Sequence, residues 1–325
     1  MSSIFSLHDL KVSFETKRGQ LNAVRGVTLT LDQGECLGIV GESGSGKTVM
    51  WRAAMGLLRG RRVNRSGKVM LAESELLSMT PKKVRRFWGT EIAMVFQDPM
   101  TALNPVRRIG SQFSEALVKR LGMSKDEANA RTIELLTLVR MPEPEKLMKK
   151  YPHQLSGGMR QRVMIAMAIA CNPKVLLADE PTTALDVTVQ AQVLDLLSEL
   201  REKLGMAMVI VTHDLGIVAG HSDRIAVMYG GEVVESARTV DLFANTRMPY
   251  TEALLNSIPK LTDVAGSRMR AIPGSPPDPV SPTTGCFFAP RCSYATDRCR
   301  NEHPELIDGG GGHLYRCFFP LGKGS

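Results

Sequence analysis

The sequence lacks any long hydrophobic run. Its longest apolar stretch is VMIAMAIAC (Val163–Cys171), which is far shorter than the roughly 20 residues that a membrane-spanning helix needs. The first ten residues, MSSIFSLHDL, contain no basic segment followed by an apolar one, so they are not typical of a secretory signal peptide. These absences predict a cytosolic protein that reaches a membrane only through its partners.

Aromatic residues are also scarce, at 5% of the 325 residues, and they are not interleaved with the basic ones. This scarcity argues against a groove for single-stranded nucleic acid. The net charge is +8, with basic clusters at 59–65 and 82–86 that could attract anionic lipid or nucleic acid. A solvated basic face explains these clusters better, and we expect no nucleic-acid partner.

Strand and helix patterns alternate along most of the chain. Residues 4–35 alternate between apolar and polar in the manner of strands, and a helical region follows at about 81–160. Further buried strands are expected at Lys174–Glu180, at Ala207–His213 and in a hairpin at Ile225–Ser236 that turns at Gly230-Gly231. This alternation predicts an α/β fold with a parallel sheet and an inserted helical region.

A glycine-rich segment matches a phosphate-binding loop. Residues Gly41–Thr48 read GESGSGKT, which fits the pattern G-x-x-x-x-G-K-[ST], and they follow the apolar strand-like run CLGIV. Backbone N–H groups of such a loop bind phosphate oxygens, while Lys47 contacts the β- and γ-phosphates and the Thr48 hydroxyl ligates Mg²⁺. The residues expected to bind nucleotide here are Gly41, Ser43, Gly44, Ser45, Gly46, Lys47 and Thr48.

Polar residues at the ends of other apolar runs suggest hydrolysis. Asp179 and Glu180 end the run VLLADE, where Asp179 is expected to hold Mg²⁺ and Glu180 to orient or deprotonate the attacking water. Gln97 follows a strand and offers its amide to Mg²⁺ and water, and His213 ends another strand near the expected γ-phosphate. The predicted catalytic residues are Lys47, Gln97, Glu180 and His213.

In order, the chain carries GESGSGKT, VFQDP, LSGGMRQR, VLLADEP, TTALD and VTHD. This set resembles the nucleotide-binding subunits of ABC transporters. The resemblance implies a P-loop ABC-type domain with a RecA-like core, an antiparallel β subdomain and a helical subdomain. LSGG would be the signature motif, which opens a helix whose N-terminus binds the γ-phosphate of ATP held by the opposite subunit.

The resemblance also implies roles for single residues. Ser156, Gly157 and Gly158 would bind the nucleotide of the opposite subunit, and Asp186, with Ala184 and Leu185, would lie in the loop that crosses the dimer interface. Gln97 would sense the membrane subunits and His213 would be the switch histidine. Phe14 would pack against adenine, where the family usually has tyrosine. One copy cannot complete a site, so the chain must pair with itself or with a relative.

The C-terminal part resembles one branch of this family. RMPYTEALLNSIP, IPGSPPD and GCFFAPRCSYATDRC look like the ATPases of dipeptide and oligopeptide importers, and most of all like those of the dipeptide permeases. The implied organisation is an ATPase domain at 1–260 and an extension at 261–325. The implied partners are two membrane permease subunits, a homologous second ATPase and an extracytoplasmic peptide-binding protein. The chain would lie peripherally on the cytoplasmic face of the inner membrane.

Four cysteines cluster in this extension with the spacing C-x5-C-x6-C-x17-C, at Cys286, Cys292, Cys299 and Cys317. In a cytosolic protein such a cluster favours a metal over disulfides. The spacing differs from the paired C-x2-C usual for zinc, whereas four thiolates suit an iron–sulfur cluster. Some members of the branch carry a 4Fe–4S cluster on this motif. We therefore expect a 4Fe–4S cluster, with zinc or unligated thiols as the alternatives.

Together these features predict the ATP-hydrolysing subunit of an ABC importer for dipeptides or oligopeptides, with ATP and Mg²⁺ bound at a dimer interface. The same machine could import another solute, such as a nickel chelate or glutathione. A non-transport ABC ATPase is a rival hypothesis, against which the single cassette argues. A regulatory module without turnover is a third, against which the presence of both Glu180 and His213 argues.

Overall fold

The structure is a computed structural model. It describes residues 3–58, 60, 62–183, 186–258, 272–281 and 284–322. Within these ranges, no helix combines the length and the apolar character that crossing a bilayer requires. The chain divides into two compact units. The first is formed mainly by Thr80–Ile210, and the second by Ser3–Leu31, Cys36–Met79 and Val211–Ser325.

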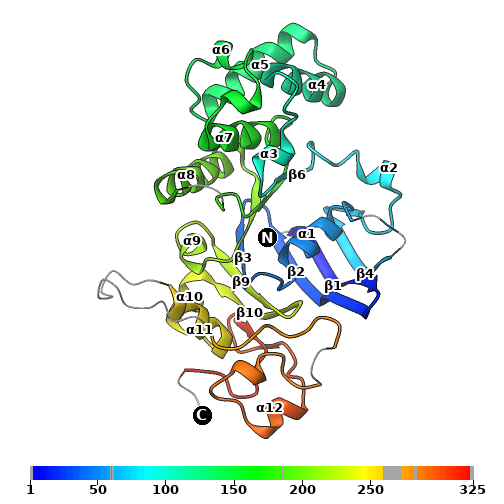
Figure 1. The fold of residues 1–325 in the computed structure, drawn as a ribbon, viewed down its shortest axis with the longest axis vertical. Helices are drawn as coiled ribbons and strands as arrows, with labels where there is room; N and C mark the ends of the chain where they lie inside the picture. Colours follow the sequence, from blue (N-terminus) through cyan, green and yellow to red (C-terminus); the bar gives the residue numbers. More distant parts are fainter. Residues whose placement is uncertain are drawn as a thin grey trace. The chain divides into compact units, whose positions relative to one another are not determined.

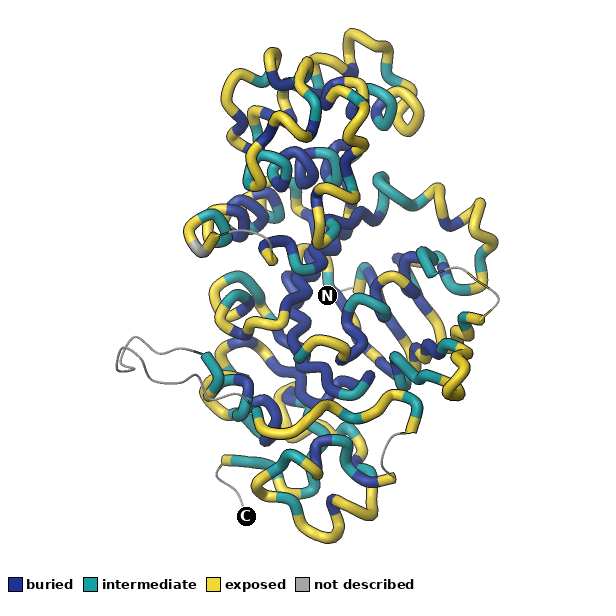
Figure 2. The backbone as a smooth tube through the Cα atoms, in the orientation of Figure 1, coloured by how far each residue is buried: buried dark blue, intermediate teal, exposed yellow. Residues whose placement is uncertain are grey.

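The first unit is built on buried strands. In spatial order these are β8 (Ala207–Thr212), β7 (Val175–Asp179) and β6 (Ile92–Val95). β6 and β7 run parallel, with Ile92 opposite Val175 and Val95 opposite Ala178. Every residue of the three strands is buried, as their uninterrupted apolar sequences require of a sheet covered on both faces. Figure 2 shows this burial as dark blue tube along the strands.

Helices form the rest of the first unit. α5 packs against α4 and α7, and the three lie close together in Figure 1. α5 begins at Ser124 with a capping box, in which Ser124 and Glu127 each bond the other's backbone N–H. The helices are α2 (Pro81–Val84), α3 (Pro99–Ala102), α4 (Ile109–Leu121), α5 (Lys125–Leu138), α6 (Pro144–Leu147), the 3₁₀ turn η1 (Pro152–Gln154), α7 (Gly157–Ala168) and α8 (Val187–Leu204).

The second unit contains an antiparallel sheet in the order β2-β1-β4-β5. β1 pairs with β4 from Phe5 opposite Leu71 to Phe14 opposite Val63, with a shift of register between His8 and Lys11. The predicted strand character of residues 4–35 is thereby confirmed. The strands are β1 (Ser3–Thr16), β2 (Gly19–Asp32), β4 (Val63–Leu71) and β5 (Ser74–Glu75).

The other strands of this unit lie side by side in the order β11-β12-β10-β9-β3. β3 runs parallel to β9, and β9 and β10 form the predicted hairpin. Both glycines of its turn, Gly230 and Gly231, have positive φ angles of 56° and 86°, which a two-residue turn of this kind requires. The strands are β3 (Cys36–Val40), β9 (Arg224–Tyr229), β10 (Glu232–Arg238), β11 (Ile307–Asp308) and β12 (Leu314–Tyr315).

Short helices and the C-terminal extension complete the second unit. Residues 272–281 and 284–285, which are the described part of a Pro- and Gly-rich segment, contain no helix or strand. Beyond it, β12 pairs antiparallel with β10, with Tyr315 opposite Glu235. The extension therefore continues the sheet. The helices are α1 (Lys47–Ala54), α9 (Leu215–Ala219), α10 (Thr239–Ala244), α11 (Pro249–Ser257), η2 (Ala289–Arg291) and α12 (Asp297–Asn301).

Candidate nucleotide site

The glycine-rich segment forms a tight loop between β3 and α1. Gly46 is the N-cap of α1 and has a left-handed φ of 98°. A Cβ atom at Gly46 would lie 2.4 Å from the carbonyl oxygen of Ala23, so only glycine fits this position. The loop thus folds closely enough to turn its backbone N–H groups and the N-terminus of α1 toward an anion.

Lys47 lies inside this loop. Its Nζ donates hydrogen bonds to the carbonyl oxygens of Gly41 at 2.7 Å and Glu42 at 2.9 Å, and to Ser45 Oγ at 3.3 Å. The residue is only 4% exposed although it carries a charge. Buried ammonium groups need such partners. The loop therefore holds one cation within itself, at the position where the sequence pattern expects a phosphate-binding lysine.

Glu180 and Gln97 are brought together in the first unit. Glu180 follows directly after β7, and Gln97 follows β6 with one residue between. Gln97 Nε2 donates to Glu180 Oε2 at 2.9 Å, and Thr183 Oγ1 donates to the same oxygen at 2.8 Å. Glu180 has a φ of 46°, a left-handed conformation that is uncommon for a non-glycine residue and concentrated at functional sites.

Thr183 was missed by sequence reasoning. Thr183 lies three residues after Glu180, and its hydroxyl holds the Glu180 side chain in place. The available signal was the pair of threonines in EPTTALD, because a hydroxyl beside a turn can reach back to a preceding carboxylate.

Asp179, the last residue of β7, is 1% exposed, so the predicted Mg²⁺ ligand is buried within the first unit.

Ser156 and Asp186 both begin helices. Ser156 is the N-cap of α7 and accepts a hydrogen bond from the Met159 N–H at 3.3 Å, while its own hydroxyl proton is still available to an incoming acceptor. A Cβ atom at Gly158 would lie 3.0 Å from Val189 Cγ1. Asp186 caps α8 by accepting from the Val189 N–H at 2.9 Å. The predicted interface residues Ala184 and Leu185 lie outside the described residues.

The remaining predicted residues lie in the second unit. Thr48 is half-buried at the second position of α1. His213 is exposed directly after β8, and the next residue, Asp214, caps α9 by accepting from the Gly216 N–H at 2.7 Å. Phe14 is half-buried on β1 opposite Val63, so part of its ring is available for stacking.

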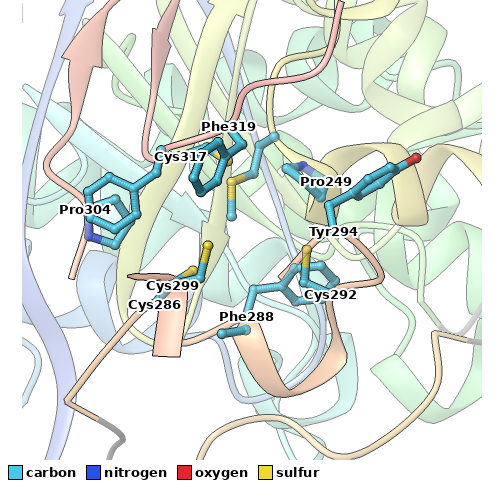
Figure 3. A pocket seen from close by; sticks show the side chains of 12 residues that line it. Pro249, Cys286, Phe288, Cys292, Tyr294, Cys299, Pro304, Cys317 and Phe319 are labelled. Carbon is cyan, nitrogen blue, oxygen red and sulfur yellow. The ribbon is translucent and has the colours of Figure 1, made fainter. Parts of the chain in front are cut away.

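The four C-terminal cysteines line one small cavity, which Figure 3 shows with Phe288, Pro304 and Phe319. All four are free thiols. Burial raises the pKa of Cys286, Cys292 and Cys317, in the last case to about 11. Cys299 Sγ lies 3.6 Å from Thr296 Oγ1.

The prediction of a 4Fe–4S cluster is wrong. Among the described residues, which include all four of these cysteines, no group of three or more His, Cys, Asp or Glu side chains is arranged to hold a metal ion. The similar proteins reported below are named only as transport ATP-binding proteins. Spacing alone suggested the cluster, but burial among apolar side chains accounts for these cysteines without a metal.

Comparison with known proteins agrees with this geometry. Residues 24–183 match the family model for "ABC transporter", and residues 234–299 match that for "Oligopeptide/dipeptide transporter, C-terminal region". The chain is 47% identical to the oligopeptide transport ATP-binding protein AppD of Bacillus subtilis over 320 residues, which cover 98% of this chain and 97% of that protein. It is 46% identical to the dipeptide transport ATP-binding protein DppD of Haemophilus influenzae over 321 residues, which cover 99% and 97%.

Solved structures share the fold. The dimeric post-hydrolysis structure of the ATP-binding cassette MJ0796 with ADP and Pi has a TM-score of 0.65 and 29% identity, covering 72% of this chain and 98% of that one. The chain belongs to the ABC transporter ATP-binding proteins, in the oligopeptide/dipeptide branch. It is an ABC-type ATPase. The predictions of fold class and of a peptide-importer ATPase are confirmed at the level of this family.

Proposed function

We propose that this chain hydrolyses ATP at a site completed by a second cassette, and that hydrolysis drives uptake of dipeptides or oligopeptides through membrane permeases. The observation that carries the proposal is the hydrogen bond between Gln97 Nε2 and Glu180 Oε2 at 2.9 Å. It joins the residue expected to activate water to the residue expected on the loop that reaches the membrane subunits. The names of the similar proteins support the peptide cargo.

The phosphate loop of the second unit would hold the nucleotide. Backbone N–H groups of Gly41–Thr48 and the ammonium of Lys47 suit the phosphates, and Phe14 suits the adenine ring. Thr48, Gln97 and Asp179 offer hydroxyl, amide and carboxylate oxygens, which are the ligands that Mg²⁺ prefers. A bound Mg²⁺ would offset phosphate charge. This donor set fits the ion.

Glu180 would act as the base. Gln97 and Thr183 both donate to one of its oxygens, so its carboxylate keeps one orientation. Glu180 would accept a proton from water as the water oxygen bonds to the γ-phosphorus and the bond to the β,γ-bridging oxygen breaks. His213 would contact the γ-phosphate. Ser156, Gly157 and Gly158 would stabilise charge on the nucleotide of the opposite subunit, and Asp186 would lie near that interface.

The proposed assembly has two permease subunits, a homologous second ATPase and an extracytoplasmic peptide-binding protein. This chain would lie on the cytoplasmic face of the inner membrane. We propose 1–260 as the ATPase domain, with its helical subdomain at about 81–160, and 261–325 as the extension. The match of residues 234–299 to a transporter C-terminal region supports an extension specific to this branch.

The test is an ATPase assay of the purified transporter complex with and without its dipeptide-loaded binding protein. Dipeptide should stimulate turnover. In the same complex, Glu180→Gln should keep ATP binding and lower kcat by roughly 100- to 10,000-fold, because a positioned base contributes that much. Glu199→Gln is the matched control, since Glu199 is an exposed carboxylate with a side chain 55% exposed.

Each arm of this test can contradict a separate part of the proposal. Hydrolysis by the Glu180→Gln complex at the parent rate would overturn the assignment of the base. Full ATPase activity that no peptide alters, but that a nickel chelate or glutathione stimulates, would overturn the peptide cargo and leave the ATPase assignment standing.

A further inference from the structure

The C-terminal extension contacts the phosphate loop through one arginine. Arg291 ends the 3₁₀ turn η2, and its guanidinium forms a forked ion pair with Glu42, the second residue of GESGSGKT. Nη1 lies 2.6 Å from Glu42 Oε2, and Nη2 lies 2.9 Å from Glu42 Oε1. Both residues belong to the second unit, although they lie 249 positions apart in the sequence. Such two-point pairs fix direction as well as distance.

Arg291 is enclosed on its remaining sides. Its side chain is only 3% exposed. Nε donates to the Pro273 carbonyl at 2.8 Å, Nη2 also donates to the Ile272 carbonyl at 3.1 Å, and Nη1 donates to the Tyr229 hydroxyl at 3.3 Å. Hydrogen bonding to Glu42 raises the pKa of Arg291, against an opposing effect of burial. The arginine is therefore a fixed cation beside the loop.

Glu42 is held at three points. Its carboxylate accepts from Arg291, its N–H donates to the Tyr250 hydroxyl at 2.9 Å, and its carbonyl accepts from Lys47 Nζ at 2.9 Å. Tyr250 is fully buried, and burial raises its pKa, so its hydroxyl keeps its proton. One residue of the loop thus connects the extension, α11 and the lysine that is expected to bind phosphate.

We propose that Arg291 is a positioning residue for the phosphate loop, so that the C-terminal extension sets the affinity for ATP. This inference rests on the assignment of Gly41–Thr48 as the phosphate-binding loop. The ion pair holds the loop in one shape before the nucleotide arrives, which lowers the ordering cost of binding. It also neutralises a carboxylate that would otherwise repel the triphosphate.

The test measures MgATP binding to the full-length chain by isothermal titration calorimetry. Arg291→Met should raise the Kd about tenfold, equivalent to about 1.4 kcal/mol. Arg291→Lys should recover part of the affinity, because it restores the charge but not the fork. Arg300→Met is the matched control, since Arg300 lies in the same extension with a side chain 59% exposed, and it should leave the Kd unchanged.

A second variant separates positioning from general damage. Glu42→Ala removes the same ion pair but leaves the bonds of Arg291 to Pro273 and Ile272, so it should also weaken MgATP binding. The loss should be smaller than in Arg291→Met, because no unpaired carboxylate then repels the triphosphate. The double variant should bind no more weakly than either single variant, because both remove one interaction. In the transporter complex, Arg291→Met should raise the KM for ATP and leave kcat near the parent value.

Parent affinity in Arg291→Met or Glu42→Ala, or additive losses in the double variant, would overturn the inference. Should Arg291→Met fail to fold, Glu42→Ala and Arg291→Lys still decide the question. Lys47→Ala tests the assignment of the phosphate loop separately from the role of Arg291. If Lys47→Ala also binds MgATP normally, the loop assignment itself fails; if it loses MgATP while Arg291→Met does not, only the role of Arg291 fails.

Discussion

The buried strands and the C-terminal extension are stabilised in different ways. All residues of β3, β7 and β8 are buried, and almost all are apolar, so these strands depend on the hydrophobic effect. The described part of the extension has only short elements, such as the five-residue α12 and the two-residue β11 and β12. Charged side chains attach it to the rest of the second unit, in addition to the pairing of β12 with β10 and the packing of Phe288 against Tyr229 and Tyr250.

Three acidic residues of the second unit form this attachment. Besides the pair of Glu42 with Arg291, Glu235 Oε1 lies 2.8 Å from His313 Nε2, and Glu232 Oε2 lies 3.0 Å from His303 Nε2. The difference teaches that directional ion pairs help to hold the extension in place, whereas the strands depend mainly on buried apolar area. Such pairs respond to pH, which apolar burial does not.

The largest effect on stability is expected at Glu235, whose side chain is fully buried. Its carboxylate accepts from the N–H groups of Arg247 at 2.7 Å and Met248 at 3.1 Å as well as facing His313. Glu235→Ala would leave the two N–H groups and the His313 ring without their carboxylate partner. It should therefore lower the free energy of unfolding by about 3–5 kcal/mol. Urea unfolding measures this. Glu305→Ala, at an exposed position of the extension, should change it by less than about 0.5 kcal/mol.

A smaller, pH-dependent effect is expected at His303. The Glu232 carboxylate, 3.0 Å from His303 Nε2, raises the pKa of His303 above its ordinary value of 6.5, with burial and Arg316 opposing. The folded state therefore holds the proton more tightly than the unfolded chain. The stabilisation is fully present below pH 6.5 and is lost as the pH rises through the raised value.

The comparison of parent and His303→Gln by urea unfolding across this range checks the effect. The difference in unfolding free energy should be greatest in acidic buffer and should shrink in alkaline buffer. A difference that stayed constant with pH would show that His303 acts only through its ring contact with Phe287, whose centroid lies 4.8 Å away.

The smallest effect is expected from an exposed pair in the first unit. Arg140 Nη2 lies 2.7 Å from both carboxylate oxygens of Glu199, but the two side chains are 58% and 55% exposed. Solvent screening should limit their coupling to about 0.2–1 kcal/mol. A double-mutant cycle of Arg140→Ala and Glu199→Ala, repeated at high salt, measures it. A coupling energy above this range that did not fall at high salt would show that the exposed pair behaves like the buried pairs of the extension.

Sequence reasoning succeeded where structure depends on neighbours along the chain. The buried strands and the turn at Gly230-Gly231 both follow from local patterns. The pair of Arg291 and Glu42 could not be predicted this way, because no periodicity links residues so far apart. The cysteines were misread for a related reason, since their spacing says nothing about burial or about the direction of each thiol.

The docking of β12 onto β10 has one more consequence. β10 has six of its seven residues buried, and an uncovered strand of this kind offers a row of N–H and C=O groups to which another protein molecule can add. β12 occupies that edge, and β11 then ends the sheet with a strand of two residues. The extension therefore also protects this sheet against edge-to-edge aggregation.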